Sequence, residues 1–358
     1  MITFLTSSVQ DTIERHDIEE LTCFMDTYQE YVNVLKDQYS NQSLLQLATR
    51  NRWYEGVLVL LRNGVDVNYY TDDGMTALAI ACSMGEMEII KLFVLGNKWF
   101  VVDEVDADNR TLLAMACEHG HLHVVKALLD LHANTSIYNL TTRYRPVHVA
   151  CRHGHIDILK TLMVHGANVH YVEGEPNPLQ VACEYDRLEI IHLLLDVGVE
   201  NIDSLGPDGR TPLHTSIVMG NIVIVNELIR HGSDIHKRSL SQRTGLHFAA
   251  EYGRTEIVKM FLQHGAYIDV EVPKSDISVR DMETPLFMAM NNDHFDVIET
   301  LLVHGATLPS LTDRNKTMRA FVLKVHNAIL RNGINGVCRE YLETDIVRII
   351  DQYCYGYD

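Results

Sequence analysis

One apolar residue recurs through most of the chain at a nearly constant interval. It is a leucine or valine at Leu45, Leu78, Leu113, Val147, Leu179, Leu213, Leu246 and Leu286. The successive intervals are 33, 35, 34, 32, 34, 33 and 40 residues. A repeat of this length corresponds to one small supersecondary unit, which can bury its apolar side only against the units before and after it. The period therefore predicts a stack of about eight units.

The residues around this position carry the signals of two short helices. In the stretch "GRTPLHTSIVMGNIVIVNELIRHGSDI" (209–235), Thr211 can cap a helix, Pro212 suits the first helical position and Leu213 points into the core. Gly220 can form a left-handed turn before the second helix, and Gly232 can end that helix. Each repeat therefore predicts a helix-turn-helix unit.

Some repeats depart from this pattern at the glycines. Arg52, Asp186 and Asp293 stand at the glycine position between the two helices, and His132 stands at the closing glycine. These departures mark the weaker places of the repeat, and aspartate tolerates a left-handed backbone better than arginine does.

The copies of the motif read "RTPLHTS", "RTGLHFA", "YRPVHVA", "MTALAIA", "RTLLAMA", "PNPLQVA" and "ETPLFMA". This pattern resembles the ankyrin repeat, and the resemblance covers about residues 40 to 308. It implies an all-α fold: an ankyrin-repeat α-solenoid of stacked helix-turn-helix units with hairpin loops and helical caps.

Three parts of the chain follow from this pattern. Residues 1–39 are predicted as a degenerate repeat or N-terminal helical cap, and residues 40–308 as the repeat domain. Seven extra residues lengthen the hairpin loop at 269–283, which either contacts a partner or is a tolerated surface loop. Residues 309–358 have helical spacing without the motif, so they form a C-terminal helical cap or a docking segment.

Charge and hydropathy exclude several classes of partner. The 358 residues carry a net charge of −18, and residues 171–209 hold nine acidic residues against one arginine. Because phosphate binding needs a continuous basic surface, we expect no nucleic-acid partner. The longest aliphatic run, residues 57–61, is too short to cross a bilayer, and the N-terminus lacks a signal-peptide pattern. We expect a cytoplasmic protein with no membrane contact.

Histidines and cysteines recur at fixed places in the repeat. His148, His214 and His247 share one place in the motif, so a structural role is favoured over a metal site, even for "HGHLH" at 119–123. The cysteines Cys82, Cys117, Cys151 and Cys183 share another place, and we expect reduced, buried small side chains there. No metal and no cofactor are predicted.

No enzyme signature is present in the sequence. The chain lacks a phosphate-binding glycine loop, the kinase motifs and a Gly-x-Ser-x-Gly elbow. We therefore predict no catalytic residues and no enzymatic activity.

The resemblance to ankyrin repeats implies that partners bind at the hairpin tips and at the exposed side of the first helices. Tyrosine, methionine and arginine are enriched at interface centres, although about half of these tyrosines should pack between hairpins. The predicted partner-binding residues are Tyr69, Tyr70, Met75, Met84, Tyr138, Tyr144, Arg152, Tyr171, Tyr185, Met219, Lys237, Arg238, Arg243 and Tyr252.

A modification site is also suggested by a resemblance. Residues 60–68 resemble the Leu-x5-Asp-aliphatic-Asn pattern on which asparaginyl hydroxylases act in ankyrin repeats, with Asn68 as the modified residue. The alternative, which the overlap with the repeat consensus favours, is that Asn68 only holds the hairpin.

The leading functional hypothesis is a monomeric, non-enzymatic protein-interaction module, an adaptor or scaffold that binds partner proteins on its concave face. One alternative is a substrate receptor of a cullin-type ubiquitin ligase, because "LETDIVRIIDQYC" (342–354) resembles the opening of an F-box. Glu343 stands where that box has proline, so a hydrophobic cap is preferred there. A host-directed effector would use the same surface.

Overall fold

The structure is a computed structural model that describes residues 2–33, 35–36, 41–72, 74–96, 100–172, 174–199, 201–272 and 283–307. The chain divides into two compact units, residues 1–199 and residues 200–358, which we describe separately as unit 1 and unit 2. The predicted C-terminal segment, 309–358, and most of the long loop, 269–283, lie outside the described residues. The predictions for these two segments stay predictions.

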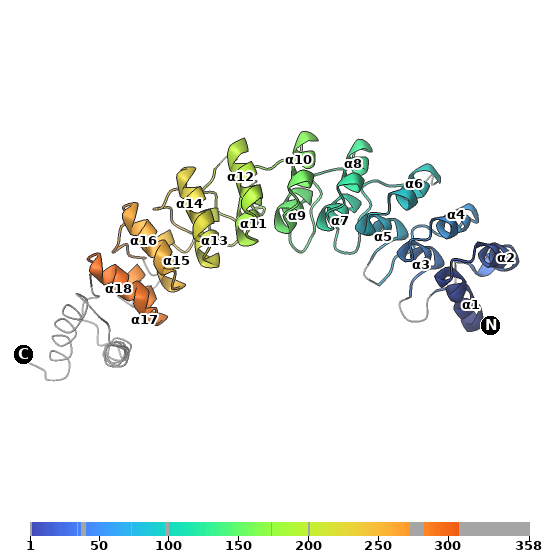
Figure 1. Ribbon diagram of the computed structural model, residues 1–358, viewed down its shortest axis with the longest axis horizontal. Helices are drawn as coiled ribbons and strands as arrows, with labels where there is room; N and C mark the ends of the chain where they lie inside the picture. The colour runs from blue at the N-terminus through green and yellow to red at the C-terminus, as the bar shows by residue number, and fades with distance from the viewer. Residues whose placement is uncertain are drawn as a thin grey trace, which may run out of the picture. The chain divides into compact units, whose positions relative to one another are not determined.

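Unit 1 consists of helix pairs. The pairs are α1 (Ile2–Glu14) with α2 (Ile18–Tyr28) and the short η1 (Gln29–Tyr31), α3 (Leu44–Arg50) with α4 (Tyr54–Arg62), α5 (Ala77–Met84) with α6 (Met87–Gly96), α7 (Leu112–Glu118) with α8 (Leu122–Asp130), α9 (Pro146–His153) with α10 (Ile156–Val164), and α11 (Pro178–Glu184) with α12 (Leu188–Val197). The first helices pack on one another in the order α1, α3, α5, α7, α9 and α11, as Figure 1 shows. Each pair is therefore covered by its neighbours.

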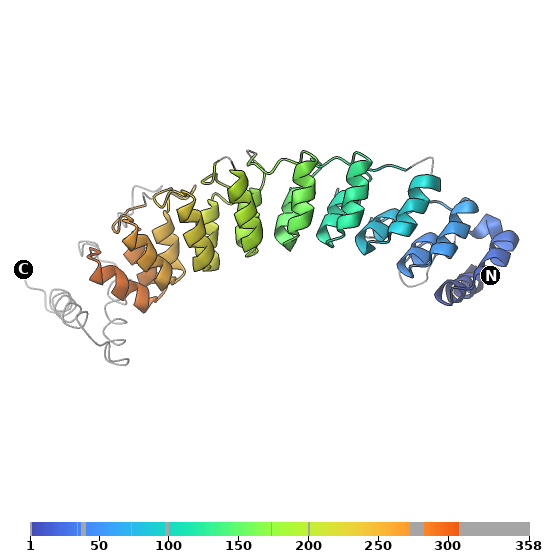
Figure 2. The ribbon, with the colours of Figure 1, turned by 45° about the horizontal axis from the view of Figure 1, so that its top comes forward.

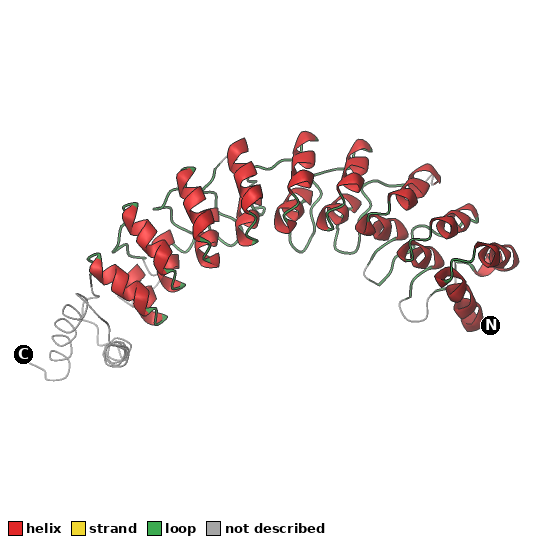
Figure 3. Ribbon diagram, viewed as in Figure 1, coloured by secondary structure: helices red, strands yellow, loops and turns green. Residues whose placement is uncertain are grey.

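Unit 2 continues the same construction. Its pairs are α13 (Pro212–Met219) with α14 (Ile222–Arg230), α15 (Gly245–Glu251) with α16 (Thr255–Gln263), and α17 (Pro285–Asn291) with α18 (Phe295–Val303). Helix α15 packs between α13 and α17, and α16 packs between α14 and α18 (Figure 2). Figure 3 shows helices and loops only in the described part of the chain, where pairing between extended segments is limited to isolated bridges such as Val105 with Thr111. The all-α prediction is confirmed.

The first helices start where the motif predicts. Thr211 has an extended backbone, and its hydroxyl accepts the amide of His214 at 3.2 Å, while Pro212 occupies the first helical position. Thr76 and Thr111 accept the corresponding amides at 3.1 Å. Each hydroxyl satisfies one of the amides that a helix start leaves without a partner.

The short turns between the two helices of a pair require a left-handed backbone. Gly220 has φ 82°, and the predicted substitutes Arg52, Asp186 and Asp293 have φ 56°, 58° and 57°. His132, at the closing position, has φ 63°. The backbone is therefore left-handed also where glycine is absent, and those positions bear the steric cost that glycine avoids.

The periodically repeated leucines and valine lie in the core. None of the eight repeated leucine and valine positions is more than 4% exposed. The four cysteines Cys82, Cys117, Cys151 and Cys183 are fully buried and form no disulfide, as predicted. Burial raises the pKa of Cys82, Cys117 and Cys151, which keeps these thiols protonated and unreactive.

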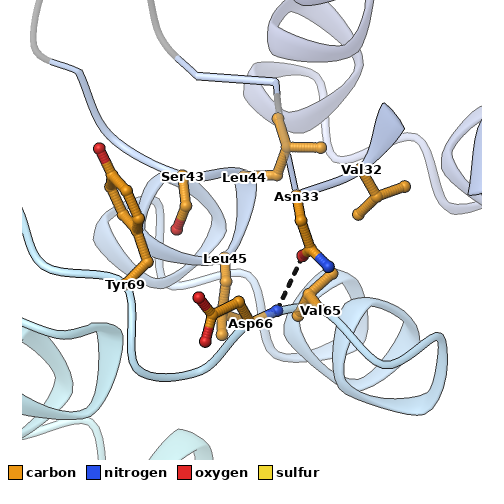
Figure 4. Close-up of a pocket in the computed structure, with 8 residues that line it drawn as sticks. All are labelled: Val32, Asn33, Ser43, Leu44, Leu45, Val65, Asp66 and Tyr69. Atoms are coloured by element: carbon orange, nitrogen blue, oxygen red, sulfur yellow. Dashed lines mark hydrogen bonds between the residues drawn. The ribbon is translucent and has the colours of Figure 1, made fainter. Parts of the chain in front are cut away.

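The N-terminal segment joins the stack through the same contacts that link later repeats. The Asn33 side chain accepts the amide of Asp66 at 2.8 Å (Figure 4), just as Asp103 accepts the amide of Asn134 at 2.7 Å. His16 has φ 55°, like the residues of the short turns, and its ring stacks on Trp53 with 5.3 Å between ring centres. Residues 37–40 are not described, so the boundary at residue 39 stays a prediction.

Side-chain volumes are matched between two positions of the repeat. The repeat formed by α13 and α14 has Pro212 at the start of its first helix and Leu228 in its second helix, and both side chains are buried. In α15 and α16, Gly245 goes with the larger Phe261, whose ring would lie only 2.5 Å from a Cβ placed on Gly245. The glycine therefore makes room for the phenylalanine, which keeps the packing density of the core.

Candidate protein-interaction surface

Arginines hold the base of the hairpins, which are the segments between the second helix of one pair and the first helix of the next. In unit 1, Arg110 lies 2.7 Å from the buried carboxylate of Asp106 and 3.5 Å from Glu118 of α7. In unit 2, Arg243 occupies the same motif position and lies 3.0 Å from both Glu251 and Glu283. Partly exposed ion pairs contribute only about 0–1 kcal/mol, so their main effect is to orient the hairpins.

Three of the predicted residues come together between α9 and α11 of unit 1. The guanidinium carbon of Arg152 lies 5.1 Å from the centre of the Tyr185 ring, a distance suited to a cation–π contact. Tyr144 stacks on His148 with 5.7 Å between ring centres. Burial raises the pKa of Tyr144 to about 12, with smaller increases from Glu184 and Tyr185 that Arg152 partly offsets. The phenol therefore stays neutral and can donate a hydrogen bond.

The predicted tyrosines divide into two groups. Half-buried tyrosines are Tyr69, Tyr144, Tyr171 and Tyr185, and exposed tyrosines are Tyr70, Tyr138 and Tyr252. Tyr69 shows how a half-buried ring is held: the Lys36 ammonium lies 4.2 Å from its ring centre, and its hydroxyl donates to the Asn41 carbonyl at 3.2 Å. Figure 4 shows Tyr69 near Ser43 at the hollow between the N-terminal segment and α3.

The predicted methionines differ in the same way. Met75 and Met84 of unit 1 are half-buried. Met219 of unit 2 is exposed at the end of α13, at the place that Tyr252 occupies after α15. Unit 2 therefore presents a methionine and a tyrosine at matching positions of neighbouring pairs.

The three basic residues at 237–243 do not form one continuous cationic surface. Arg243 is matched by two carboxylates, as described above. The Arg238 guanidinium donates to the carbonyls of Gln242 and Glu271, at 2.8 and 3.2 Å. Lys237 is exposed, and its carbonyl lies 3.2 Å from Nε2 of His214. The Arg238 and Arg243 side chains are thus engaged in contacts that stabilise the hairpins.

Asn68 is exposed on its hairpin. Its backbone amide donates to the Asp66 side chain at 3.0 Å, so this hydrogen bond of the hairpin uses the main chain of residue 68. Hydroxylation of the Asn68 side chain stays a prediction.

Two exposed leucines at the hairpin tips were not predicted. Leu140 and Leu240 are 65% and 74% exposed. The amide of each donates to the preceding hairpin, Leu140 to Asp108 at 3.1 Å and Leu240 to Gly209 at 2.8 Å. The sequence did contain a signal for these two residues, namely a leucine at the same hairpin position in two repeats. The prediction of partner-binding residues overlooked it because it considered only tyrosine, methionine and basic residues.

Two histidines of "HGHLH" contact backbone carbonyls of the preceding repeat, while Nδ1 of the third, His119, lies 3.0 Å from the Met115 carbonyl of its own helix. Nε2 of His121 lies 2.9 Å from the Ser83 carbonyl, and Nε2 of His123 lies 2.9 Å from the Gly85 carbonyl. Among the residues that the structure describes, no three His, Cys, Asp or Glu side chains are grouped to hold a metal ion.

Stacked helix pairs with repeated caps and left-handed turns define a helical repeat solenoid. The family model described as ankyrin repeats (3 copies) matches residues 15–99, 96–173, 147–239 and 224–313. The chain belongs to the ankyrin-repeat family, as its motif predicts. The ankyrin-repeat fold is typically a non-enzymatic protein-interaction module, so protein partners are implied for this chain.

Two of the relatives are much longer than the segments that they share with this chain. The human transient receptor potential cation channel subfamily A member 1 is 36% identical over 110 residues, which are 30% of this chain and 9% of the channel. Alpha-latrocrustotoxin-Lt1a of Latrodectus tredecimguttatus is 30% identical over 147 residues, 40% of this chain and 10% of the toxin. The chain thus spans about a tenth of the length of these relatives.

A solved structure has the same fold. The ankyrin repeat domain of human ASB11 superimposes with a TM-score of 0.56 at 22% identity, over 66% of this chain and all of that domain. In the described part of the chain, no helix is long and apolar enough to cross a membrane.

Proposed function

We propose that this chain is an adaptor or scaffold that binds partner proteins through its hairpins and first helices. The observation that carries the proposal is the group formed by Tyr144, Arg152 and Tyr185 in unit 1, with the exposed Tyr138 on the adjoining hairpin. Aromatic and arginine side chains supply most of the energy at protein interfaces. Their presence together at one part of the repeat surface supports this role.

The arrangement also lowers the entropic cost of binding. Arg152 is held over Tyr185, and the Arg187 side chain donates to the Arg152 carbonyl at 2.9 Å. Because these side chains are already restrained in the folded chain, less rotamer freedom is lost when a partner covers them. The half-buried rings can therefore act as binding residues without a conformational change.

The test is affinity capture by the full chain, with mass spectrometry, from lysate of cells that express it. We expect Tyr138→Ala with Tyr185→Ala to reduce recovery of the captured proteins at least about tenfold, because truncation of a hot-spot tyrosine costs about 2 kcal/mol or more.

The matched control is Tyr54→Ala. Tyr54 is an exposed tyrosine of the same unit, but it lies at the start of α4, away from the hairpins. Its substitution should leave recovery unchanged. Equal recovery by the control and by the double variant, with both folded, would show that the hairpin and first-helix surface is not the binding surface.

The described residues do not test the alternative roles. The ubiquitin-ligase role depends on residues 342–354, and a host-directed effector role has no distinguishing feature among the described residues. These roles, the monomeric state and the cytoplasmic location stay predictions.

A further inference from the structure

The short turn between α13 and α14 of unit 2 carries an exposed apolar patch. Val223 is 52% exposed, Met219 48% and Ile222 38%. Met219 ends α13, and Ile222 and Val223 begin α14, so the three residues surround a single turn. Grouped exposed apolar side chains on a folded protein often mark a binding site.

The other repeats show that the fold does not require an apolar residue at Val223. The second residue of the second helix is polar in the other pairs from α3 to α18: Glu55, Glu88, His123, Asp157, Glu189, Glu256 and Asp296. Acidic residues are favourable there because they lie at a helix N-terminus. Helix α14 is capped instead by Asn221, which accepts the amides of Val223 and Ile224 at 3.0 and 3.1 Å. The side chain of the exposed valine therefore has no role in starting its helix.

The patch continues onto the next helix pair. The Arg254 side chain reaches back to donate to the Val218 carbonyl at 2.7 Å, and its guanidinium lies against Gly220. Tyr252, exposed after α15, occupies the same place in its repeat as Met219. Helices α13 and α15 pack on each other, as Figures 1 and 2 both show. The Arg254 side chain therefore links the turn between α13 and α14 to the next helix pair, where Tyr252 is exposed.

Beyond Tyr252 the same edge is hollowed and acidic. The hollow is lined by Gly253, Thr255, Asp293, His294, Phe295, Asp296 and Val297. Nε2 of His294 lies 2.9 Å from the Glu251 carbonyl, so that nitrogen is already engaged. The lining contains two carboxylates and no lysine or arginine. A cationic side chain is the complement of this hollow.

We propose that this short-turn edge of unit 2 binds a protein segment in which a lysine or arginine lies next to aliphatic or aromatic side chains. The cation enters the hollow beside Asp296, and the apolar side chains cover Met219, Ile222 and Val223. Burial of the apolar patch provides affinity, and the Asp296 carboxylate selects the basic residue. This surface shares Met219, at the end of α13, with the first helices of the proposed function, but it does not depend on the group formed by Tyr144, Arg152 and Tyr185.

The probe is a phage-displayed library of random twelve-residue peptides, selected on the immobilised full chain. We expect enrichment of peptides with lysine or arginine beside leucine, isoleucine or phenylalanine. A synthetic copy of an enriched peptide, measured by fluorescence polarisation, should bind Val223→Glu at least about tenfold more weakly. Asp296→Asn should weaken binding severalfold and reduce its salt dependence, because one carboxylate is lost.

Both variants should remain folded. Glutamate occupies the position of Val223 in α4, α6, α12 and α16, so Val223→Glu should leave the Tm nearly unchanged. The control is Val303→Glu, which adds the same charge at an exposed valine at the far end of α18 and should leave peptide affinity unchanged.

Three results would overturn the proposal: no enriched peptides, enrichment of acidic peptides, or equal binding by Val223→Glu and the wild-type chain. Peptides that lose binding to Tyr138→Ala with Tyr185→Ala, but not to Val223→Glu, would overturn the edge site and leave the proposed function intact.

Discussion

Lowering the pH from about 6.5 to 4 is expected to destabilise the folded chain strongly, because three buried histidines must remain neutral. In each, Nδ1 accepts the amide of the helix-capping residue, at 3.0 Å for His148 and 3.2 Å for His214 and His247. Nε2 of His148 lies 2.8 Å from the Pro176 carbonyl, so the ring proton is on Nε2. Protonation of Nδ1 would remove its hydrogen bond and bury a charge.

The direction follows from the pKa values of the folded and unfolded chains. Burial lowers the pKa of His148, His214 and His247 from 6.5 to about 4. Below pH 6.5 the unfolded chain therefore binds protons that the folded chain does not, and the contribution of these histidines to the free energy of unfolding falls until about pH 4, where it levels off. Each histidine contributes a loss of about 3 kcal/mol over this range, against a typical total stability of about 5–15 kcal/mol.

The chain provides its own control for this prediction. Gln46 occupies the same motif position in α3, where its carbonyl accepts the Ser43 amide at 2.8 Å and its amide group donates to the Tyr69 carbonyl at 2.8 Å. A variant with His148→Gln, His214→Gln and His247→Gln should keep these bonds without titrating. Urea unfolding followed by circular dichroism from pH 7 to pH 4 should show a smaller loss for this variant. Parallel pH profiles for the variant and the wild-type chain would contradict the assignment.

Gly245→Pro is expected to destabilise unit 2 by about 2 kcal/mol, although proline is the common residue at this motif position. A Cβ on residue 245 would lie 2.5 Å from the Phe261 ring and 2.9 Å from Ile217. These buried groups cannot move aside without disturbing the core. Thermal and urea unfolding of the variant would measure the loss.

Adding Phe261→Leu to Gly245→Pro should restore the stability that Gly245→Pro alone removes. Phe261→Leu alone leaves a cavity and should cost about 1–2 kcal/mol. Together, Gly245→Pro and Phe261→Leu recreate the pairing of Pro212 with Leu228, so the double variant should be about as stable as the wild-type chain. The coupling energy should be at least about 2 kcal/mol. Additive losses would show that the two positions do not share a volume.

Local signals made the fold predictable from the sequence. Thr211 and Pro212 predict the start of a helix because capping depends on neighbouring residues alone. The left-handed turns at Asp186 and Asp293 were predictable because the repeat supplies glycine at the same place elsewhere. Period and motif together therefore determine the helix pairs and the family.

The surface was less predictable because its chemistry depends on residues far apart in the sequence. The sequence around Arg243 suggests an exposed cation that is available to a partner. In the structure, Arg243 pairs with Glu251 and with Glu283, which is 40 residues away. Exposure of Leu140 and Leu240 depends on how one hairpin lies on the preceding one. Val223 became informative only when the helix boundaries aligned it with polar residues of the other repeats.

The most direct test of the interaction role is amide hydrogen exchange on the full chain, alone and bound to a captured partner protein. The account predicts slower exchange on binding in residues 138–145 and 184–186, which contain Tyr138, Tyr144 and Tyr185. Protection confined to the second helices, with these segments unchanged, would contradict it.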